Sequence, residues 1–311
     1  MNIENKTATP VIDLGSFQDN RLWIKRDDLI PYSFGGNKVR KASLFFEEID
    51  RGNYDCVVTY GAGSSNHCRV ISNECCRRKM PCCIISPSPS GNDSFNSRIV
   101  NHFGAKVIYS PVEKVHDTIE ETLRQLEREG FHPFFIEGGG HGNTGTEAYV
   151  RCYYEIKQFE ESSFTVFDYI FFASGTGTTQ AGLVCGQLLS HDTKKIVGIS
   201  IARKNPRGRN IILESIRSYL GDRVEEKDIL DATEFVDNYS SGYGIYDKKI
   251  SDTIFEVFSG YGIPLDPIYT GKAFWGMKEY LKEKSVKDKN ILFIHTGGTP
   301  LFFDFLNAKE F

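Results

Sequence analysis

Short apolar runs alternate with longer stretches of mixed polar and apolar residues, and this alternation limits the chain to few folds. The apolar runs have the length of buried strands and lie at residues 56–60, 82–86, 106–109, 134–137, 168–173, 195–201 and 291–295. The stretches between them have the length of helices and lie at residues 66–80, 93–103, 114–129, 143–159, 178–191 and 207–220. Apolar strands that alternate with helices are typical of parallel sheets covered on both faces. We therefore predict an α/β protein.

The length of the chain and the grouping of the strands indicate two structural units. A chain of 311 residues has room for about two domains of about 150 residues each. The four strands between residues 56 and 137 could form one four-stranded unit, and the strands from residue 168 onward could form another. Residues 86–91, SPSPSG, are interpreted as a surface turn inside the first unit.

Charge and hydropathy argue against several classes of protein. The 37 Lys and Arg residues are outnumbered by 41 Asp and Glu residues, which gives a net charge of −4. A dominant nucleic-acid binder usually carries a basic excess, so we expect no nucleic-acid partner. The apolar runs are much shorter than the about 20 residues of a membrane span, so we expect no membrane segment. The first ten residues lack the charged and apolar parts of a secretory signal, and we expect none.

The eight cysteines are clustered, with six of them between Cys56 and Cys83. Their CC-x5-CC spacing differs from the paired CxxC spacing of a structural zinc site. We therefore expect free core thiols in a reducing cytosol. A metal or redox role is the alternative.

Glycines follow the predicted strands, at residues 61–63, 138–142, 175–177 and 297–298. Open α/β sheets bind ligands at the carboxyl ends of their strands. The chemistry of the chain should therefore be sought in these turns and in the Gly-Gly turn of residues 34–41, FGGNKVRK.

The turn at residues 34–41 carries a candidate nucleophile. Its two glycines allow a tight turn and a close approach to a ligand, while Asn37 supplies an amide and Lys38 an amine. An amine held near a carbonyl can form a Schiff base. The alternative is an ordinary surface turn with a solvated lysine.

Two further turns are candidate anion sites at helix starts. Residues 60–67, YGAGSSNH, could receive a carboxylate, although a simple N-cap by Ser64 or Ser65 is the alternative. Residues 174–183, SGTGTTQAGL, offer free N–H groups and hydroxyls for a phosphate, although a tight strand-to-helix turn is the alternative. This second turn lacks the lysine of a P-loop, so it suits a tightly held cofactor phosphate.

Three more segments could line the same site. Thr270 in LDPIYTGKA and Thr296 in IHTGGTP each stand beside a glycine, where the backbone can approach a flat ring. Tyr243 stands between two glycines and could face a cleft, although a packed core tyrosine is the alternative.

FGGNKVRK, SSNHCR, SGTGTTQAGL, YTGKA and HTGG occur in this order. The set resembles the D-cysteine desulfhydrase and 1-aminocyclopropane-1-carboxylate deaminase family, within the tryptophan synthase β-like, fold type II, pyridoxal phosphate enzymes. The resemblance runs from about residue 10 to residue 305. It implies two open, mostly parallel twisted sheets flanked by helices, with the cofactor, pyridoxal 5′-phosphate, in the cleft between two domains. It also implies a larger domain of residues 1–44 and 155–311 and a smaller one of residues 45–154.

The resemblance implies a role for each site residue. Lys38 would form the Schiff base, Asn66 would bind the phenolic oxygen of the cofactor, and Asn37 would lie near it. The phosphate would be held by four residues, Thr176, Gly177, Thr178 and Thr179. Ser65, Asn66 and His67 would bind the substrate carboxylate or assist proton transfer, and Tyr243 and Tyr269 would flank the substrate. The catalytic residues would be Lys38, Tyr269, Tyr243 and Ser65, with no metal.

Two positions separate the branches of this family. The deaminases place a Glu where this chain has Thr270, and a Leu where it has Thr296. A carboxylate beside the pyridine nitrogen keeps it protonated, whereas a hydroxyl leaves it less cationic, which favours β-elimination over cyclopropane opening. Residues 137–149 depart from the family pattern and add His141, which places the exact substrate in question.

The implied activity is α,β-elimination from a β-substituted amino acid, most simply conversion of D-cysteine to pyruvate, hydrogen sulfide and ammonia. Alternatives are a 1-aminocyclopropane-1-carboxylate deaminase, a racemase, or a lyase for cysteate, serine or a biosynthetic substrate. A cofactor-free anion-binding protein and a noncatalytic cofactor-carrying partner are rivals from other classes. The resemblance further implies a cytoplasmic homodimer with a small amino-acid substrate.

Overall fold

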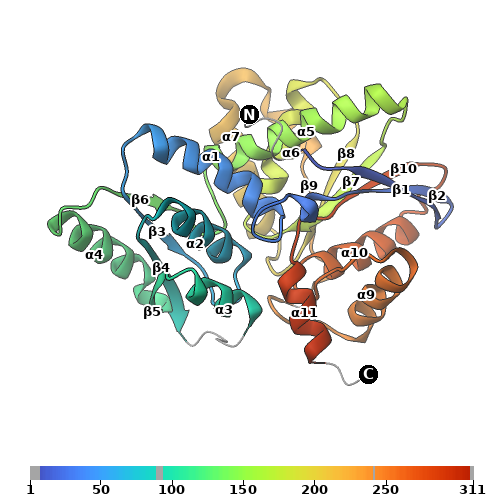
Figure 1. Ribbon diagram of the computed structural model, residues 1–311. Helices are drawn as coiled ribbons and strands as arrows, with labels where there is room; N and C mark the ends of the chain where they lie inside the picture. The colour runs from blue at the N-terminus through green and yellow to red at the C-terminus, as the bar shows by residue number, and fades with distance from the viewer. Residues whose placement is uncertain (1–7, 89–93, 241, 309–311) are drawn as a thin grey trace.

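The computed structural model describes residues 8–88, 94–240 and 242–308. Its described part contains two lobes, each built on one twisted sheet (Figure 1). The smaller sheet is parallel throughout and has the order β5 (Lys106–Pro111), β4 (Cys82–Ser88), β3 (Cys56–Tyr60), β6 (Pro133–Ile136). The larger sheet has the order β1 (Val11–Phe17), β2 (Asn20–Lys25), β10 (Asn290–Ile294), β7 (Tyr169–Ser174), β8 (Lys195–Ser200), β9 (Glu234–Val236). Only β1 among these described strands runs antiparallel to its neighbour, β2.

All seven strands expected from the apolar runs are present, and so is the four-stranded unit between residues 56 and 137. The sequence reasoning missed β1, β2 and β9. The first two carry charged side chains within their apolar pattern, and β9 has three residues. The surface turn expected at residues 86–91 is wrong for its first half, because Ser86–Ser88 pair with β5. Residues 89–91 lie outside the described residues.

Eleven α-helices flank the sheets within the described residues. They are α1 (Asn37–Arg51), α2 (Asn66–Arg78), α3 (Phe95–His102), α4 (Val115–Arg128), α5 (Asn143–Ser163), α6 (Thr178–Leu189), α7 (Arg207–Leu220), α8 (Glu226–Ala232), α9 (Lys248–Tyr261), α10 (Thr270–Glu283) and α11 (Thr299–Asn307). The six helices expected from the mixed stretches are confirmed as α2 to α7. None of the helices in the described part combines the length and the apolar character that crossing a bilayer requires.

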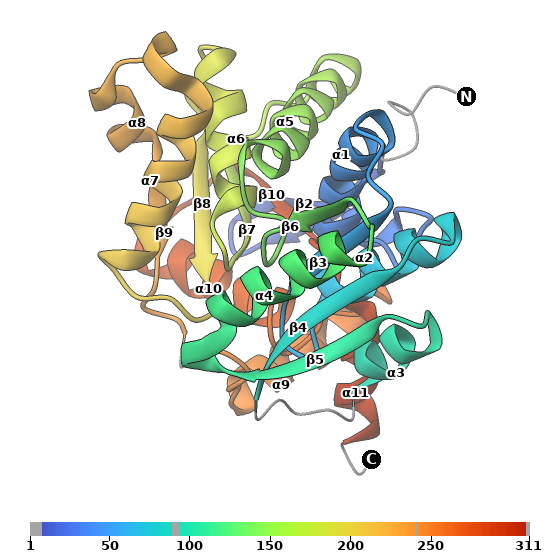
Figure 2. The same cartoon turned by 90° about the vertical axis from the view of Figure 1, so that its left-hand side faces the viewer.

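The smaller sheet is covered on both faces because neighbouring strand residues point in opposite directions. Ile84 packs in one cluster with apolar residues of α1 and α2, whereas Ile85 packs in another with residues of α4. Figure 2 shows α4 on one side of this sheet and α2 and α3 on the other. Helix α1 therefore packs on the smaller sheet, but it also contacts the larger lobe, because its Leu44 joins the main core there.

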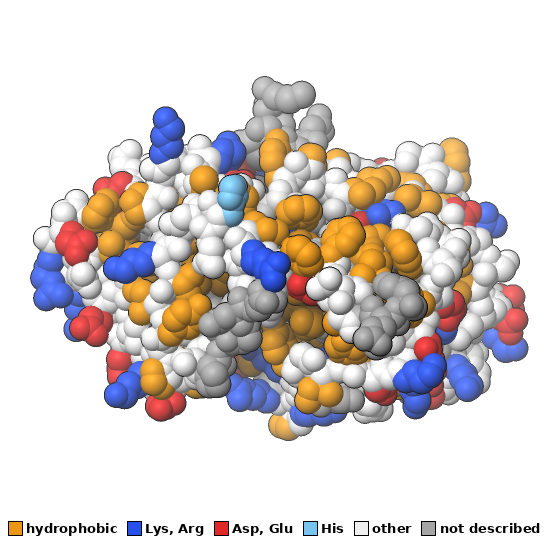
Figure 3. Space-filling model, turned by 60° about the horizontal axis from the view of Figure 1, so that its bottom comes forward, with side chains coloured by type: hydrophobic (Ala, Val, Ile, Leu, Met, Phe, Trp, Pro, Cys, Tyr) orange, Lys and Arg blue, Asp and Glu red, His pale blue; other side chains and the backbone are white. Residues whose placement is uncertain are grey.

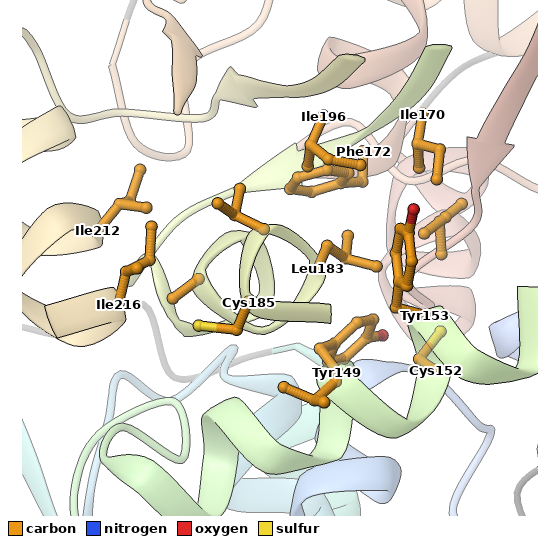
Figure 4. Close-up of a cluster of buried hydrophobic side chains, with 14 of the residues drawn as sticks. Tyr149, Cys152, Tyr153, Ile170, Phe172, Leu183, Cys185, Ile196, Ile212 and Ile216 are labelled. Atoms are coloured by element: carbon orange, nitrogen blue, oxygen red, sulfur yellow. The ribbon is translucent and has the colours of Figure 1, made fainter. Parts of the chain in front are cut away.

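The main core of the larger lobe surrounds α6 (Figure 4). Leu183 and Cys185 of this helix are fully buried among side chains of α5, α7, β7 and β8. Two glycines bring α6 close to α5, because a Cβ at Gly182 or Gly186 would lie 2.5 Å from the Cβ of Tyr149 or Tyr153. A helix that is apolar on all sides must be enclosed in this way, and its buried N-terminus is thereby fixed in place.

Each sheet falls wholly within one of the two predicted domains. The boundary after residue 44 lies inside α1, and the boundary after residue 154 lies inside α5. The division therefore stays a proposal, in which two continuous helices would connect the domains.

All eight cysteines are free. Seven of them are buried, which fits the expected core thiols, but Cys76 is exposed on α2. The expectation of a core thiol is therefore wrong for Cys76.

Candidate active site

The start of α1 is held against the turn that follows β10. Gly36 has a φ of +98°, and a Cβ there would lie 2.7 Å from the Thr296 carbonyl oxygen. The Asn37 backbone N–H donates to that same carbonyl at 3.0 Å. Only glycine allows this approach, since L side chains rarely adopt such a φ. The contact fixes Lys38 as the second residue of α1.

Lys38 is partly buried, and its Nζ donates to the Gly139 carbonyl oxygen at 3.1 Å. Burial lowers the pKa of this amine to about 8, although the Cys68 thiol opposes the shift. Lys41 lies one turn further along α1 and points its Nζ at the same carbonyl, at 3.5 Å. Burial and the charge of Lys38 lower the pKa of Lys41 well below its usual value. The neutral form of Lys38, which a nucleophile or base requires, is therefore far more populated near neutral pH than in an ordinary lysine.

The start of α2 presents the amide of Asn66. Its Oδ1 accepts from Arg69 at 2.8 Å and from Asn96 Nδ2 at 3.0 Å. These two donors fix the orientation of the amide, so that its Nδ2 remains as the donor for a ligand. Burial lowers the pKa of Arg69 to about 9. Asn66 therefore has the hydrogen-bonding capacity that a phenolic oxygen needs.

Ser65 is the N-cap of α2, and its Oγ accepts from the backbone N–H groups of His67 and Cys68 at 3.2 and 3.3 Å. The His67 ring is buried and lies 2.8 Å from the Thr59 hydroxyl. Burial and the charges of Lys38 and Lys41 hold the pKa of His67 well below its usual value. The shift favours a neutral His67, whose ring contacts β3. Its expected role in binding the substrate carboxylate or in assisting proton transfer stays a prediction.

At the start of α6, residues 176–179 form a cup, and this is where the phosphate is expected. Gly177 is its N-cap with a φ of +100°, and no side chain of the described residues caps the helix. Thr179 Oγ1 accepts from Asn37 Nδ2 at 3.2 Å, and Thr178 Oγ1 lies 3.0 Å from His141 Nδ1. A Cβ at Gly139 would lie 2.7 Å from Thr176 Cγ2 and 3.4 Å from Lys38 Nζ. The cup and the Lys38 amine therefore meet at one glycine.

Two tyrosines on the larger lobe form a pair. The hydroxyls of Tyr243 and Tyr269 are 2.9 Å apart, and 47% of Tyr243 is exposed, in keeping with its expected position. Burial and the neighbouring Tyr243 hydroxyl raise the pKa of Tyr269 well above its usual value. Tyr269 therefore stays protonated and can act as a proton donor, but not as a base, at neutral pH.

Thr270 is fully buried, and its hydroxyl donates to Asp266 Oδ2 at 2.7 Å. Asp266 also accepts from the backbone N–H groups of residues 268, 269 and 270. Burial raises the pKa of Asp266 despite these donors. The Asp266 carboxyl is thus hydrogen-bonded to the hydroxyl of Thr270, the residue that is expected to face the pyridine nitrogen.

Sequence reasoning missed Asp266, Lys41 and the pair of Arg69 and Asn96. Lys41 could have been found, because it follows Lys38 by three residues on a helix and shares its face. Arg69 could have been found in the same way, because it follows Asn66 by three residues on α2. Asn96 could not, since its contact with Asn66 joins segments 30 residues apart.

The residues fit pyridoxal phosphate. The first four N–H groups of a helix have no partner inside it, so the buried and uncapped start of α6 calls for an anion. The Lys38 amine and Thr176 of this cup both lie close to Gly139. The site thus combines the Lys38 amine, the cup of α6 and the amide donor of Asn66. This is the donor set of an enzyme that carries an aldehyde cofactor on a lysine.

Comparison with known proteins agrees with this class. The family model described as pyridoxal-phosphate dependent enzyme matches residues 4–297, and the chain belongs to that family. D-cysteine desulfhydrase from Yersinia enterocolitica is 30% identical over 312 residues, covering 95% of this chain and 93% of the relative. The enzyme of the same name from Serratia proteamaculans is 30% identical over 315 residues, covering 96% and 93%.

Solved structures show the same fold. A crystal structure of a homologue of ACC deaminase superposes with a TM-score of 0.84 at 29% identity, covering 96% of this chain and 92% of that one. A hydrogen sulfide-producing enzyme from Fusobacterium nucleatum has a TM-score of 0.69 at 17% identity, covering 96% and 98%, and supports the fold alone. The expected family, cofactor and α/β fold of two mostly parallel sheets are thus confirmed.

Proposed function

We propose that the protein is a pyridoxal-phosphate-dependent lyase that eliminates a β-substituent from an amino acid, most simply D-cysteine. D-Cysteine and water would give pyruvate, hydrogen sulfide and ammonia. The observation that carries the proposal is the Lys38 amine, buried and with a pKa of about 8, next to the uncapped start of α6. The D-cysteine desulfhydrases that match nearly the whole chain support the choice of substrate.

The bound cofactor would withdraw electrons from the substrate α-carbon. Thr176, Gly177, Thr178 and Thr179 would hold its phosphate, and Asn66 would donate to its phenolic oxygen. Asn37 and Thr296 would position the start of α1, through the hydrogen bond between the Asn37 N–H and the Thr296 carbonyl. Thr270 would face the ring nitrogen.

Lys38 would hold the cofactor and, once released, take the α-proton, because its buried amine is partly neutral at pH 7. Tyr269 and Tyr243 would then deliver a proton to the departing sulfur, since the phenol of Tyr269 stays protonated. Ser65 would help to bind the substrate carboxylate through its hydroxyl hydrogen, because its lone pairs already accept from α2.

Replacing Lys38 tests this function. Lys38→Ala should remove the visible absorbance of the bound cofactor and lower turnover of D-cysteine by at least about 10²-fold. The control is Lys284→Ala, which removes an exposed lysine at the end of α10 and should change neither quantity. A Lys38→Ala protein that keeps both its colour and its turnover would refute the proposal.

Deamination of 1-aminocyclopropane-1-carboxylate is the second candidate, favoured by the similarity to the ACC deaminase homologue. Thr270 and Thr296 argue for elimination, as set out above. A panel of D- and L-cysteine, D-cysteate, D-serine and 1-aminocyclopropane-1-carboxylate distinguishes the candidates. Sulfide release from D-cysteine supports the first, and ammonia from the cyclopropane alone supports the second.

We also infer that the protein works as a homodimer in the cytoplasm. Its free cysteines suit a reducing compartment.

Exposed apolar side chains support the dimer. They gather at the centre of the face shown in Figure 3. Phe258 of α9 and Phe303 of α11 are among the exposed large apolar residues of the described part. Such exposed groups often mark contacts between proteins. A monomer mass in light scattering would contradict the dimer.

A further inference from the structure

His141 lies in the loop between β6 and α5, which passes along the whole candidate site. Within this loop the Gly139 carbonyl accepts from Lys38, and two residues later His141 Nδ1 lies 3.0 Å from Thr178 Oγ1. The first turn of α5, which follows the loop, also approaches the cup, since a Cβ at Gly145 would lie 3.2 Å from Thr178 Cγ2. The imidazole therefore borders the phosphate end of the site.

The contact with Thr178 links the charge of the imidazole to the cup. A protonated imidazole can only donate at Nδ1, so it would occupy a lone pair of the Thr178 hydroxyl. The hydroxyl hydrogen of Thr178 would then be free to donate to an anion at the helix start. Protonation thus adds both a positive charge and a correctly directed donor to the cup.

We propose that His141 is a further cofactor-binding residue, whose protonated imidazole tightens the hold of the α6 cup on the phosphate group. The inference rests on the cofactor function proposed above and adds a residue to it. Residues 137–149, which depart from the family pattern, would then affect cofactor binding as well as the choice of substrate.

The surroundings of His141 disfavour its protonated form in the cofactor-free protein. Burial lowers its pKa, and the positive charges of Lys41 on α1 and Arg203 after β8 lower it further. Glu137 in the same loop and Glu214 on α7 oppose that shift. The Arg203 guanidinium donates to the Gly175 carbonyl at 3.0 Å, so its charge also stands at the cup.

A phosphate in the cup would reverse this balance, because its charge of nearly −2 favours the imidazolium. Binding would then take up a proton. By linkage, phosphate affinity should rise as the pH falls through the pKa of His141 in the complex, and level off below its pKa in the free protein.

The test measures cofactor affinity against pH in the cofactor-free protein, by absorbance titration with pyridoxal phosphate and, separately, with pyridoxal, which has no phosphate. The matched variant is His141→Asn, which keeps a hydrogen bond to Thr178 but does not titrate. His141→Gln serves as a second variant, and thermal unfolding of the cofactor-free variants checks their fold. The ratio of wild-type to variant affinity cancels the titrations of the phosphate and of Lys38.

We expect this ratio for pyridoxal phosphate to rise about tenfold as the pH is lowered from 8 to 6, which corresponds to a His141 pKa about one unit higher in the complex than in the free protein. For pyridoxal the ratio should not change with pH. A ratio that is independent of pH, or that changes equally for both ligands, would overturn the proposal. If neither protein binds either ligand at any pH, the cofactor function itself fails, an outcome distinct from a flat ratio.

Discussion

At the residue scale, the chemistry depends on burial acting on single side chains. The Lys38 amine has its pKa lowered, and the Tyr269 phenol has its pKa raised, for the same reason: a charged form loses its hydration. In water the amine and the phenol have similar pKa values, and the two shifts give them opposite roles in proton transfer. One becomes a proton acceptor and the other remains a proton donor.

Tyr269→Phe should separate these roles. The variant should keep the visible absorbance of the cofactor, since Lys38 is intact, but lose about 10²-fold in kcat because the proton donor to the leaving sulfur is gone. Steady-state sulfide release and an absorbance spectrum measure both effects.

The control for this change is Tyr261→Phe, which removes a hydroxyl from a tyrosine at the end of α9 that is 38% exposed. It should leave kcat unchanged. Unaltered kcat in Tyr269→Phe would remove this tyrosine from the mechanism.

At the element scale, α1 is anchored by a buried ionic cluster. Asp27 begins the 3-10 turn Asp27–Leu29, which follows β2. Its two carboxylate oxygens each accept a hydrogen bond from Arg40 of α1 at 2.7 Å. Tyr149 of α5 donates to the same carboxylate at 2.8 Å. Because Arg40 follows Lys38 by two residues, this cluster holds the helix that carries the candidate nucleophile.

Asp27→Asn should therefore be strongly destabilising. It removes one of the two carboxylates that neutralise the buried charges of Arg40 and Lys25 and leaves them Glu155 alone, at a cost of about 3–5 kcal/mol in the free energy of unfolding. Asp252→Asn breaks only an exposed pair with Lys248 and should cost less than about 1 kcal/mol. Urea unfolding of both variants measures the difference; equal losses would contradict a structural role for the cluster.

The same residue predicts a pH dependence. Burial raises the pKa of Asp27, but the charges of Arg40 and Lys25 outweigh it and lower the pKa to about 2, from the usual 3.8. The contribution of this ionised carboxylate to the free energy of unfolding is complete above pH 3.8 and is lost as the pH falls toward 2. The stability of the protein should therefore fall with acidification in that window. The wild-type protein should lose about 2 kcal/mol more than Asp27→Asn there.

At the scale of the whole molecule, the site is assembled from both lobes. Lys38 and Asn66 come from helices packed on the smaller sheet, and the cup comes from α6 in the core of the larger one. A ligand that touches all three must stabilise their arrangement, because it binds the folded state alone.

Removal of the cofactor should therefore lower the melting temperature. At a cofactor concentration of about 100 times Kd, binding adds about 2.7 kcal/mol to the free energy of unfolding, or several degrees in Tm. Pyridoxal at equal concentration should stabilise less, since it leaves the α6 cup empty. Differential scanning calorimetry measures both, and equal shifts would argue against the cup as the phosphate site.

The sequence by itself determined the seven strands of apolar runs, the helices α2 to α7 and the glycine turns, because periodicity and backbone freedom are local properties. It also determined the family, through five motifs in order. It could not determine β2, which pairs with β10 about 270 residues later, or β1, which pairs with β2 at the edge of that sheet. Nor could it determine the settings of individual groups: the carboxyl of Asp266 behind Thr270, the His67 ring turned toward β3, or the imidazole of His141 against Thr178. These depend on which segments meet when the core around α6 closes, and burial then sets their charge, so only the tertiary structure decided them.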